Sequence, residues 1–238
     1  MFSGKTAVIF DLDGTLIDSL GIWHAVDVEL VTRLGRPDLA DGGLSAFREA
    51  ALARHASQDN PYVGFCSDLG RLCASSLSAE DIHAMRYRIS RELIRTHVRL
   101  RPGAAEAVLA MKAAGLRLAV ATTTKRTNVD IYKTTNLHIP QCLCFDDVFE
   151  FILTREDVRR IKPDPEVYLL ALSRLGVPAA RALVVEDSLA GLRAAQAAGI
   201  DAAVIAEPWS AADEARLRRG AAAYFSDWNS FPELCVNH

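Results

Sequence analysis

The sequence predicts an α/β protein in which a core built on a parallel β-sheet carries a smaller, all-helical domain. Short apolar segments alternate with helical patterns along most of the chain, which is typical of parallel strands with helices on both faces of the sheet. One region of roughly eighty residues breaks this alternation and is helical almost throughout. These two observations favour a Rossmann-like core interrupted by a separate helical module.

The predicted strands are short β-branched segments bounded by loops: Thr6–Phe10, Leu116–Thr122, the region around Val148–Leu153, Leu183–Glu186 and Ala203–Ala206. Continuous apolar stretches such as Ala182–Val185 suit burial on both faces of a sheet. The predicted helices between the strands are Ala104–Ala114, Asn128–Thr135, Pro165–Leu175 and Ala190–Ala198. Gly115, Gly176 and Gly199 lie just beyond three of these helices, where a left-handed residue commonly ends a helix.

The helical region lies between the first two predicted strands, and its predicted helices are Trp23–Leu34, Leu44–His55, Pro61–Ala74 and Ala79–His97. Asn60, which precedes a proline at the first helical position, is predicted to cap the third of these helices, and Ser78 is predicted to cap the last one, whose first turn is acidic. We therefore predict a core domain formed by residues 1–17 plus 99–238 and a cap domain formed by residues 18–98.

Composition excludes several classes of protein. The 238 residues carry a net charge of −3, which does not favour a generally basic nucleic-acid-binding protein. No apolar run approaches the roughly 18 residues of a membrane span. The first ten residues are too short for the apolar region of a signal peptide, so we expect a cytoplasmic protein without nucleic-acid or membrane partners. The oligomeric state is not predicted.

The five cysteines do not predict a disulfide framework, because their number is odd and the chain is large. Cys66 and Cys73 have helical spacing and are interpreted as small core residues. Cys142 and Cys144 form a pair without further nearby ligands, which disfavours a zinc site.

Chemically active side chains follow the predicted strands, at the sheet edge where parallel-sheet proteins bind ligands. The first strand leads into Asp11-Leu12-Asp13-Gly14-Thr15, and the second into Thr122-Thr123-Thr124. Lys162 follows the third strand, and Glu186-Asp187-Ser188 follows the fourth. Four carboxylates, those of Asp11, Asp13, Glu186 and Asp187, thus converge on one edge. Such a cluster calls for a cation, and hard oxygen ligands favour Mg²⁺.

These segments resemble the four signatures of the haloacid dehalogenase superfamily. Asp11 to Ser19 is similar to the first signature, and Thr122, Lys162 and Glu186–Asp187 fall in order at the other three. Lys162-Pro163-Asp164-Pro165 and Glu186-Asp187-Ser188-Leu189-Ala190-Gly191 resemble the branch that contains sugar phosphatases and β-phosphoglucomutases. The resemblance covers about residues 5–207 and includes a helical cap between the first two signatures.

The resemblance implies a Mg²⁺-dependent phosphatase that acts on a small phosphorylated metabolite. Asp11 would be the nucleophile that forms an aspartyl-phosphate, and Asp13 the general acid and base. Thr122 and Lys162 would hold the phosphoryl oxygens. Asp11, the carbonyl of Asp13 and Asp187 would bind the metal, with Glu186 binding it directly or through water. The presence of an acid at position 13 favours phosphate esters over carbon–halogen or carbon–phosphorus bonds.

Two other functions are compatible with these sequence motifs. A β-phosphoglucomutase-like enzyme usually has a histidine twelve residues after the nucleophile, where this chain has Trp23 and, one position later, His24. A one-residue offset on a helix turns the side chain by about 100°, which disfavours the mutase. A non-catalytic binding or regulatory module on the same scaffold is the other alternative.

Further residues are candidates for substrate binding, for the solvent-exposed surface or for helix packing. Thr123, Lys125 and Arg126 follow the second strand and are candidates for binding the substrate. Four arginines of the last cap helix and its exit lie off the apolar stripe and are interpreted as a solvated face: Arg88, Arg91, Arg95 and Arg99. Three aromatic residues are expected to pack between helices, with one of them facing the cleft: Trp23, Tyr62 and Phe65. The identity of the metabolite is not predicted.

Overall fold

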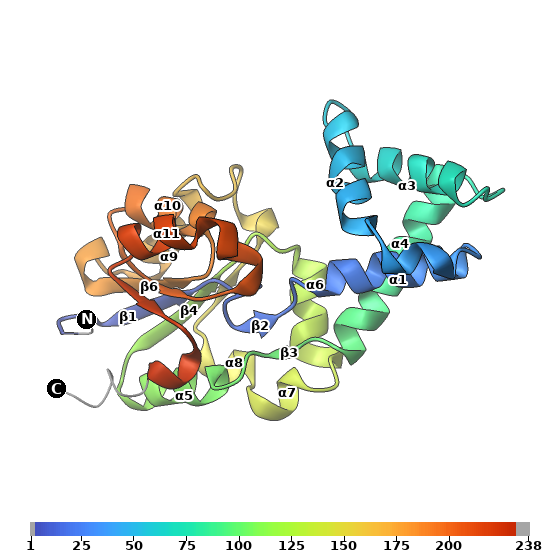
Figure 1. Ribbon diagram of the computed structural model, residues 1–238. Helices are drawn as coiled ribbons and strands as arrows, with labels where there is room; N and C mark the ends of the chain where they lie inside the picture. Colours follow the sequence, from blue (N-terminus) through green and yellow to red (C-terminus); the bar gives the residue numbers. More distant parts are fainter. Residues whose placement is uncertain (1–2, 232–238) are drawn as a thin grey trace. The chain divides into compact units, whose positions relative to one another are not determined.

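A computed structural model describes residues 3–231 of the chain, which divides into two units (Figure 1). Residues 1–20 and 98–238 form one unit, here called the sheet unit, and residues 21–97 form the other, here called the helical unit. Two short strands lie at or next to the crossing points, β2 (Ile17–Asp18) and β3 (Arg99–Leu100), and they pair antiparallel. The assignment of residues 1–17 plus 99–238 as catalytic core and 18–98 as cap stays a prediction.

The sheet unit contains a six-stranded sheet in which every neighbouring pair is parallel, as the sequence predicts. Its strands are, in spatial order, β5 (Ile152–Leu153), β4 (Arg117–Ala121), β1 (Ala7–Phe10), β6 (Ala182–Glu186), β7 (Asp201–Ile205) and β8 (Ala223–Phe225). After β1, the chain adds β4 and β5 on one side of β1, and then adds β6, β7 and β8 on its other side. Ligands bind at such a reversal of strand order in open α/β sheets, beyond the carboxyl ends of the strands.

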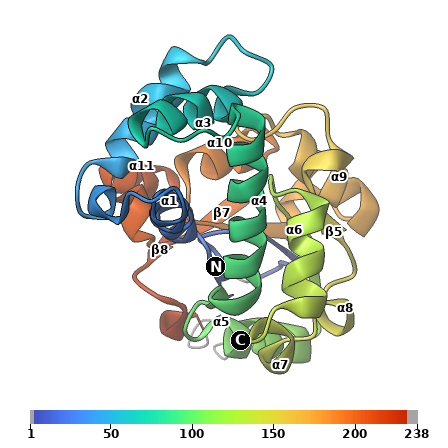
Figure 2. The same ribbon diagram turned by 90° about the vertical axis from the view of Figure 1, so that its right-hand side faces the viewer.

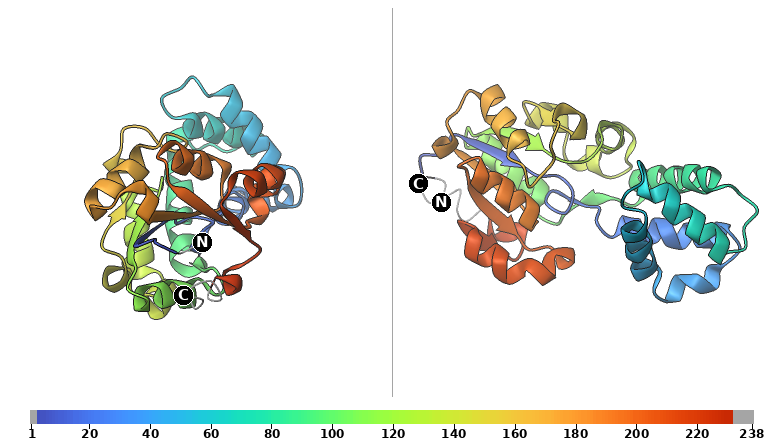
Figure 3. Two further views of the ribbon diagram at one scale, coloured as in Figure 1. Left: turned by 90° about the vertical axis from the view of Figure 1, so that its left-hand side faces the viewer. Right: turned by 90° about the horizontal axis from the view of Figure 1, so that it is seen from above.

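Helices lie on both faces of this sheet, with α9, α10 and α11 on one side and α5 and α8 on the other (Figures 1 and 3). The helices of the sheet unit are α5 (Ala104–Ala113), α6 (Arg126–Asp130), α7 (Ile139–Cys142), α8 (Phe145–Val148), α9 (Glu166–Leu175), α10 (Leu189–Ala197) and α11 (Glu214–Gly220). All four side chains of β1 and all five of β6 are buried, which explains their uninterrupted apolar sequence up to the functional residues.

Several parts of the sheet unit differ from the prediction, among them the short helices α7 and α11, which were not predicted. The predicted helix 128–135 is α6 followed by a π-helical turn, η2 (Ile131–Thr135). The strand predicted around residues 148–153 is limited to the two residues of β5. Val148 belongs instead to the helix α8, in which its side chain and that of Phe145 are buried in the core. The sequence reading missed β8, an edge strand whose three residues are only half-buried.

The helical unit consists of four α-helices (Figure 2): α1 (Ile22–Arg33), α2 (Leu44–Arg54), α3 (Pro61–Leu72) and α4 (Ala79–Thr96). A 3₁₀ turn, η1 (Pro37–Asp41), lies between α1 and α2. The side chains of Asn60 and Ser78 cap α3 and α4 by accepting hydrogen bonds from backbone N–H groups, as predicted. Cys66 and Cys73 are buried, and the arginines interpreted as a solvated face are exposed. No helix within residues 3–231 combines the length and the apolar character that crossing a bilayer requires.

A buried ion pair that the sequence reading missed lies inside the helical unit. The carboxylate of Asp27 is fully buried and accepts hydrogen bonds from Arg86 Nε at 2.8 Å and Arg48 Nη1 at 2.7 Å. The Arg86 guanidinium also lies within 6 Å of three ring centroids, those of the aromatic residues expected to pack between helices: Trp23, Tyr62 and Phe65. Arg86 therefore links α4 to the other helices through charge and through aromatic packing.

Replacing Arg86 with methionine should lower the free energy of unfolding by about 3 kcal/mol, because the buried Asp27 loses one of its two cationic partners. Urea unfolding measures the change, and hydrogen exchange should localise it to α3 and α4. The matched control is Arg88→Met, an exposed residue of the same helix, for which we expect a change within about 0.5 kcal/mol. Equal stability of the two variants would show that the buried pair does not stabilise the unit.

Candidate active site

The residues singled out at the strand ends surround one cavity of about 280 Å³ in the sheet unit. Asp11 and Asp13 reach it from the end of β1, Thr122 and Thr123 from the end of β4, and Asp187 from the end of β6. Lys162 reaches it from the loop before α9. The structure thus brings together side chains that are up to 176 positions apart in the sequence.

The ammonium group of Lys162 forms the floor of this site. Its Nζ donates hydrogen bonds to Asp11 Oδ1 at 2.6 Å, to Glu186 Oε1 at 2.6 Å and to the carbonyl oxygen of Ala121 at 2.9 Å. Burial by itself lowers the pKa of Lys162, but the facing carboxylates of Asp11 and Glu186 raise it well above its ordinary value. All three hydrogens of the ammonium have an acceptor, so its charge is directed at the two carboxylates.

Glu186 is held by protein groups on both of its oxygens. Besides Lys162, the hydroxyl of the buried Tyr168 donates to Oε1 at 2.7 Å. The backbone N–H of Asp187 donates to Oε2 at 3.1 Å, and the hydroxyl of Ser188 donates to the same oxygen at 3.1 Å. Burial would raise the pKa of Glu186, but the charge of Lys162 and the hydrogen bonds from Lys162, Tyr168 and the backbone of Ser188 together keep the pKa below its ordinary value. This carboxylate therefore acts as a fixed anion that holds Lys162 in place.

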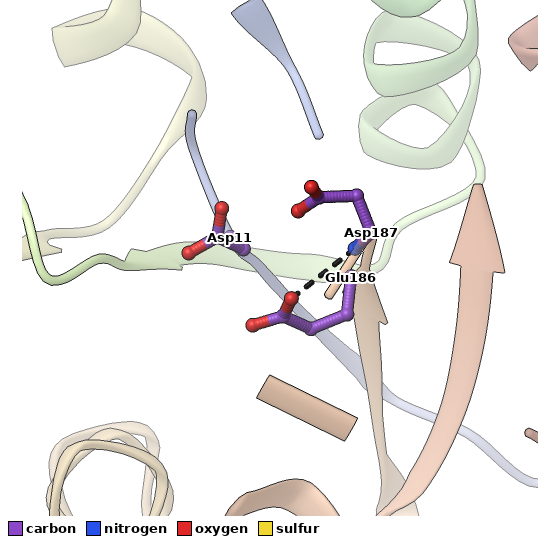
Figure 4. Close-up of side chains that lie close together, drawn as sticks. All are labelled: Asp11, Glu186 and Asp187. Carbon is purple, nitrogen blue, oxygen red and sulfur yellow. Dashed lines mark hydrogen bonds between the residues drawn. The ribbon is translucent and has the colours of Figure 1, made fainter. Parts of the chain in front are cut away.

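Asp11 and Asp187 have a different environment. Figure 4 shows both carboxylates beside Glu186 at the strand ends, and one oxygen of each of the three lies within 4.8 Å of the others. Burial raises the pKa of Asp11 to about 7 although Lys162 opposes the shift, and burial together with the charges of Glu186 and Asp11 raises the pKa of Asp187 well above its ordinary value. Two buried carboxylates this close together are costly without a cation.

The donor set fits a hard divalent cation. Asp187 Oδ1 accepts a hydrogen bond from the Thr15 hydroxyl at 2.9 Å, while the described residues donate no hydrogen bond to Oδ2 of Asp11 or Oδ2 of Asp187. These two oxygens are thus available as ligands, whereas the oxygens of Glu186 are engaged. Among the described residues, the group formed by Asp11, Glu186 and Asp187 is the one placed to share a metal ion, and the exposed Cys142 and Cys144 belong to none.

Asp13 lies beside this cluster and is held by hydroxyl groups. The Ser19 hydroxyl donates to Oδ1 at 2.5 Å and the Tyr132 hydroxyl donates to the same oxygen at 3.1 Å, while the Thr124 hydroxyl donates to Oδ2. Tyr132 belongs to the π-helical turn η2 and is 2% exposed. The side chain of Asp13 is thus fixed at the cavity wall, and within residues 3–231 its partners are hydroxyl groups rather than cations.

Of the other residues predicted to act at the site, some line the cavity and others lie outside it. The hydroxyl oxygen of Thr122 accepts a hydrogen bond from the N–H of Thr124 at 3.1 Å, so its own proton points to other acceptors. Neither Lys125 nor Arg126 lines the cavity, and Arg126 pairs with Asp157 at 2.7 Å on the surface. In the helical unit, His24 Nδ1 lies 3.2 Å from the Ser45 hydroxyl. The structure therefore does not bring Lys125 or Arg126 to the site.

Sequence reasoning assigned no role at the site to Ser19, Tyr132, Tyr168 or Trp209, while it did place the hydroxyl of Thr124 at this sheet edge. A signal for Trp209 existed, because it follows the end of β7 and the same strand-end rule applies to it. Tyr132 and Tyr168 lie on helical segments, where an aromatic residue usually indicates core packing. Their hydroxyl contacts depend on the tertiary structure.

Comparisons with known proteins agree with this geometry. A family model described as haloacid dehalogenase-like hydrolase matches residues 8–205. Protein CbbY of Rhodobacter capsulatus is 34% identical over 209 residues, which cover 87% of this chain and 88% of that protein. A Thermotoga maritima protein named phosphorylated carbohydrates phosphatase is 27% identical, with 82% of each chain covered. The structure of CbbY from Rhodobacter sphaeroides in complex with phosphate matches with a TM-score of 0.66 and 29% identity over 94% of this chain and 95% of that one. A variant of the same protein has been solved in complex with xylulose-(1,5)bisphosphate.

Replacing Gly191 with alanine tests how firmly Glu186 is fixed. A Cβ at Gly191 would collide with the Glu186 carboxylate, which its hydrogen bonds to Lys162 and Tyr168 hold in place. Helix propensity alone favours alanine in α10 by about 1 kcal/mol, so a loss of about 2 kcal/mol in the free energy of unfolding would reveal the clash. The control is Gly42→Ala, whose Cβ meets nothing within 4 Å. A Gly191→Ala protein as stable as wild type in urea would contradict the rigid placement of Glu186.

Proposed function

This chain belongs to the haloacid dehalogenase-like hydrolases and is a phosphatase of that family, and on this premise we propose that it hydrolyses small phosphorylated sugars. The proposed reaction depends on Mg²⁺ and passes through an aspartyl-phosphate at Asp11. The observation that carries the proposal is the 2.6 Å contact between buried Lys162 and Asp11 at the floor of the cavity. A phosphate dianion approaches a carboxylate nucleophile only where positive charge offsets the repulsion.

In the first step, an oxygen of Asp11 attacks phosphorus and the bond between phosphorus and the leaving oxygen breaks. Asp13 donates its proton to the departing alkoxide, which leaves as the alcohol. In the second step, Asp13 takes a proton from water, and the oxygen of that water attacks phosphorus and releases inorganic phosphate from Asp11. The hydroxyls of Ser19, Thr124 and Tyr132 would keep the Asp13 carboxylate at the cavity wall through both steps.

We propose that Asp11 and Asp187 hold the magnesium ion together with the backbone carbonyl of Asp13. The ion supplies charge neutralisation for the phosphoryl group when it is bound. Glu186 would act on the site through Lys162, or through metal-bound water, because its oxygens already accept hydrogen bonds from protein groups. Thr122 would donate its hydroxyl proton to a phosphoryl oxygen, and the exposed Thr123 lies beside it at the cavity wall.

The substrate class is proposed from the similar proteins. One of them is named for phosphorylated carbohydrates, and another has been solved with a ketose bisphosphate. The helical unit would serve as the cap, since residues 21–97 are inserted into the sheet unit between the paired strands β2 and β3, where the resemblance expects a cap. Lys125 and Arg126 follow Thr124 but do not line the cavity, so a contact of either with the substrate would lie outside the part of the site that holds the phosphoryl group.

Replacing Asp11 with asparagine should lower kcat by about a thousandfold or more, because the amide is a poor nucleophile for phosphorus. Release of inorganic phosphate from a panel of sugar phosphates measures the change. The matched control is Asp147→Asn, an exposed aspartate of α8, which should keep wild-type kcat. Full activity in Asp11→Asn would rule out the proposed nucleophile.

The same assay separates the alternative functions. A mutase would convert sugar 1-phosphates into isomers in the presence of a bisphosphate activator, without stoichiometric phosphate release. A purely binding module would release no phosphate from any of the sugar phosphates, even as the wild-type protein. We expect phosphate release and no isomerised product.

Removal of divalent metal should abolish turnover, because the buried Asp11 and Asp187 carboxylates then lack their counter-charge. Activity is measured after dialysis against EDTA and again after titration with MgCl₂. Asp187→Asn should raise the Mg²⁺ concentration needed for half-maximal activity by about tenfold or more. Unchanged activity in excess EDTA would contradict the metal-dependent reaction.

A further inference from the structure

The cavity above Lys162 has two chemically different parts. Its floor carries the acidic and hydroxyl groups already described, while its rim is formed by apolar side chains, including those of Leu20, Ile161, Ala190 and Trp209. Ligand sites commonly join such apolar surfaces to a few placed polar groups. A phosphate bound at the floor would therefore direct the rest of the molecule toward an apolar rim.

Trp209 is the most prominent part of that rim. Its exposed fraction is 61%, the highest among the large apolar side chains within residues 3–231, and Ile161 is 45% exposed. Single exposed apolar residues are ordinary on protein surfaces. Two of them lining the same polar site are informative, because exposed apolar surface next to a cavity marks a place where a ligand is covered.

The backbone under Trp209 is tied to the loop that carries the nucleophile. Arg101 donates one hydrogen bond to the carbonyl oxygen of Gly14 and another to that of Ala206, both at 2.6 Å. The same guanidinium lies 3.4 Å from the carboxylate of Glu207, and that carboxylate accepts a hydrogen bond from the N–H of Trp209. The backbone that carries the indole is thus held by hydrogen bonds, and the residue itself is 61% exposed.

The charges around the cavity restrict what the rim accepts. Among the lining residues of the described chain, Lys162 is the one cation, and its hydrogens are engaged at the floor. The apolar rim of the cavity therefore offers no positive charge to a second phosphate group. It offers an aromatic ring together with the hydroxyls of Ser188 and Ser210. A sugar matches this surface, because it presents a C–H face to a ring and hydroxyls at its edge.

We propose that Trp209, assisted by Ile161, is a specificity-determining residue whose ring packs against the carbon face of the sugar leaving group. This inference rests on the proposed phosphatase function. It places one determinant of substrate choice in the sheet unit, on the loop after β7.

The first test compares substrates with and without a sugar. The probes are glucose 6-phosphate, glucose 1-phosphate, fructose 6-phosphate and ribose 5-phosphate, with acetyl phosphate as the sugar-free reference. In Trp209→Ala, the ratio of kcat/KM for the best sugar phosphate to kcat/KM for acetyl phosphate should fall about tenfold, mainly through KM. Trp209→Phe should restore most of that ratio, because it retains an aromatic face.

Leu169→Ala is the matched control, because Leu169 is 49% exposed on α9 and does not line the cavity. It should leave the ratio unchanged. An equal loss for both kinds of substrate in Trp209→Ala would overturn the inference, since it would indicate a structural role. An unchanged ratio would overturn it as well.

The wild-type assay keeps this test separate from the proposed function. Hydrolysis of acetyl phosphate but of none of the four sugar phosphates would overturn the sugar as the occupant while leaving the phosphatase intact. Failure to hydrolyse any probe would contradict the phosphatase itself.

Fluorescence gives a readout independent of turnover. In Asp11→Asn with Mg²⁺, the best sugar phosphate should quench tryptophan emission saturably, whereas inorganic phosphate should not. The double variant Asp11→Asn/Trp209→Phe should lose the quenching. The other two tryptophans, the buried Trp228 and the half-buried Trp23 of α1, are present in both proteins, so the difference between the two measurements reports Trp209. Quenching that persists in the double variant would overturn the inference.

Discussion

The buried ammonium group of Lys162 is the interaction on which the site depends. It lies between Asp11 and Glu186 at 2.6 Å from each, where neither residue is more than 7% exposed. Without this charge, the ends of β1 and β6 would place three carboxylates against one another in a region of low dielectric. Glu186 is then best understood as the anchor of Lys162, because Tyr168 and the backbone after β6 hold its oxygens in place.

The fold provides this arrangement at the point where the order of the strands reverses. Because β4 and β6 flank β1 in parallel, the residues after all three strands meet at one edge of the sheet. Gly14 allows the close approach there: it has φ of +84°, and a Cβ would lie 2.5 Å from Asp187 Oδ2. The turn after β1 thus serves both Asp11, the proposed nucleophile, and Asp187, the proposed metal ligand opposite it.

Much of the sheet and of the candidate site was predictable from the sequence, because strand ends and signature residues are local features of a sequence. Asp11, Thr122, Lys162 and Asp187 could be assigned to one edge from strand position alone, and the structure brings them to one cavity. The hydroxyls around Asp13 could not be predicted, since Tyr132 reaches it through a π-helical turn 119 positions away. The partners of Arg126 and Arg86 are likewise set by tertiary packing: Arg126 pairs with Asp157, and the buried Arg86 pairs with Asp27 on another helix.

The most direct test of this account is to identify the residue that carries the phosphoryl group during turnover. Asp13→Asn protein with Mg²⁺ and acetyl phosphate is quenched in acid, reduced with borohydride and mapped by mass spectrometry. Removal of the general base should slow hydrolysis of the intermediate, so we expect conversion of Asp11 to homoserine. Modification of another residue, or phosphate release without any modification of Asp11, would contradict the account.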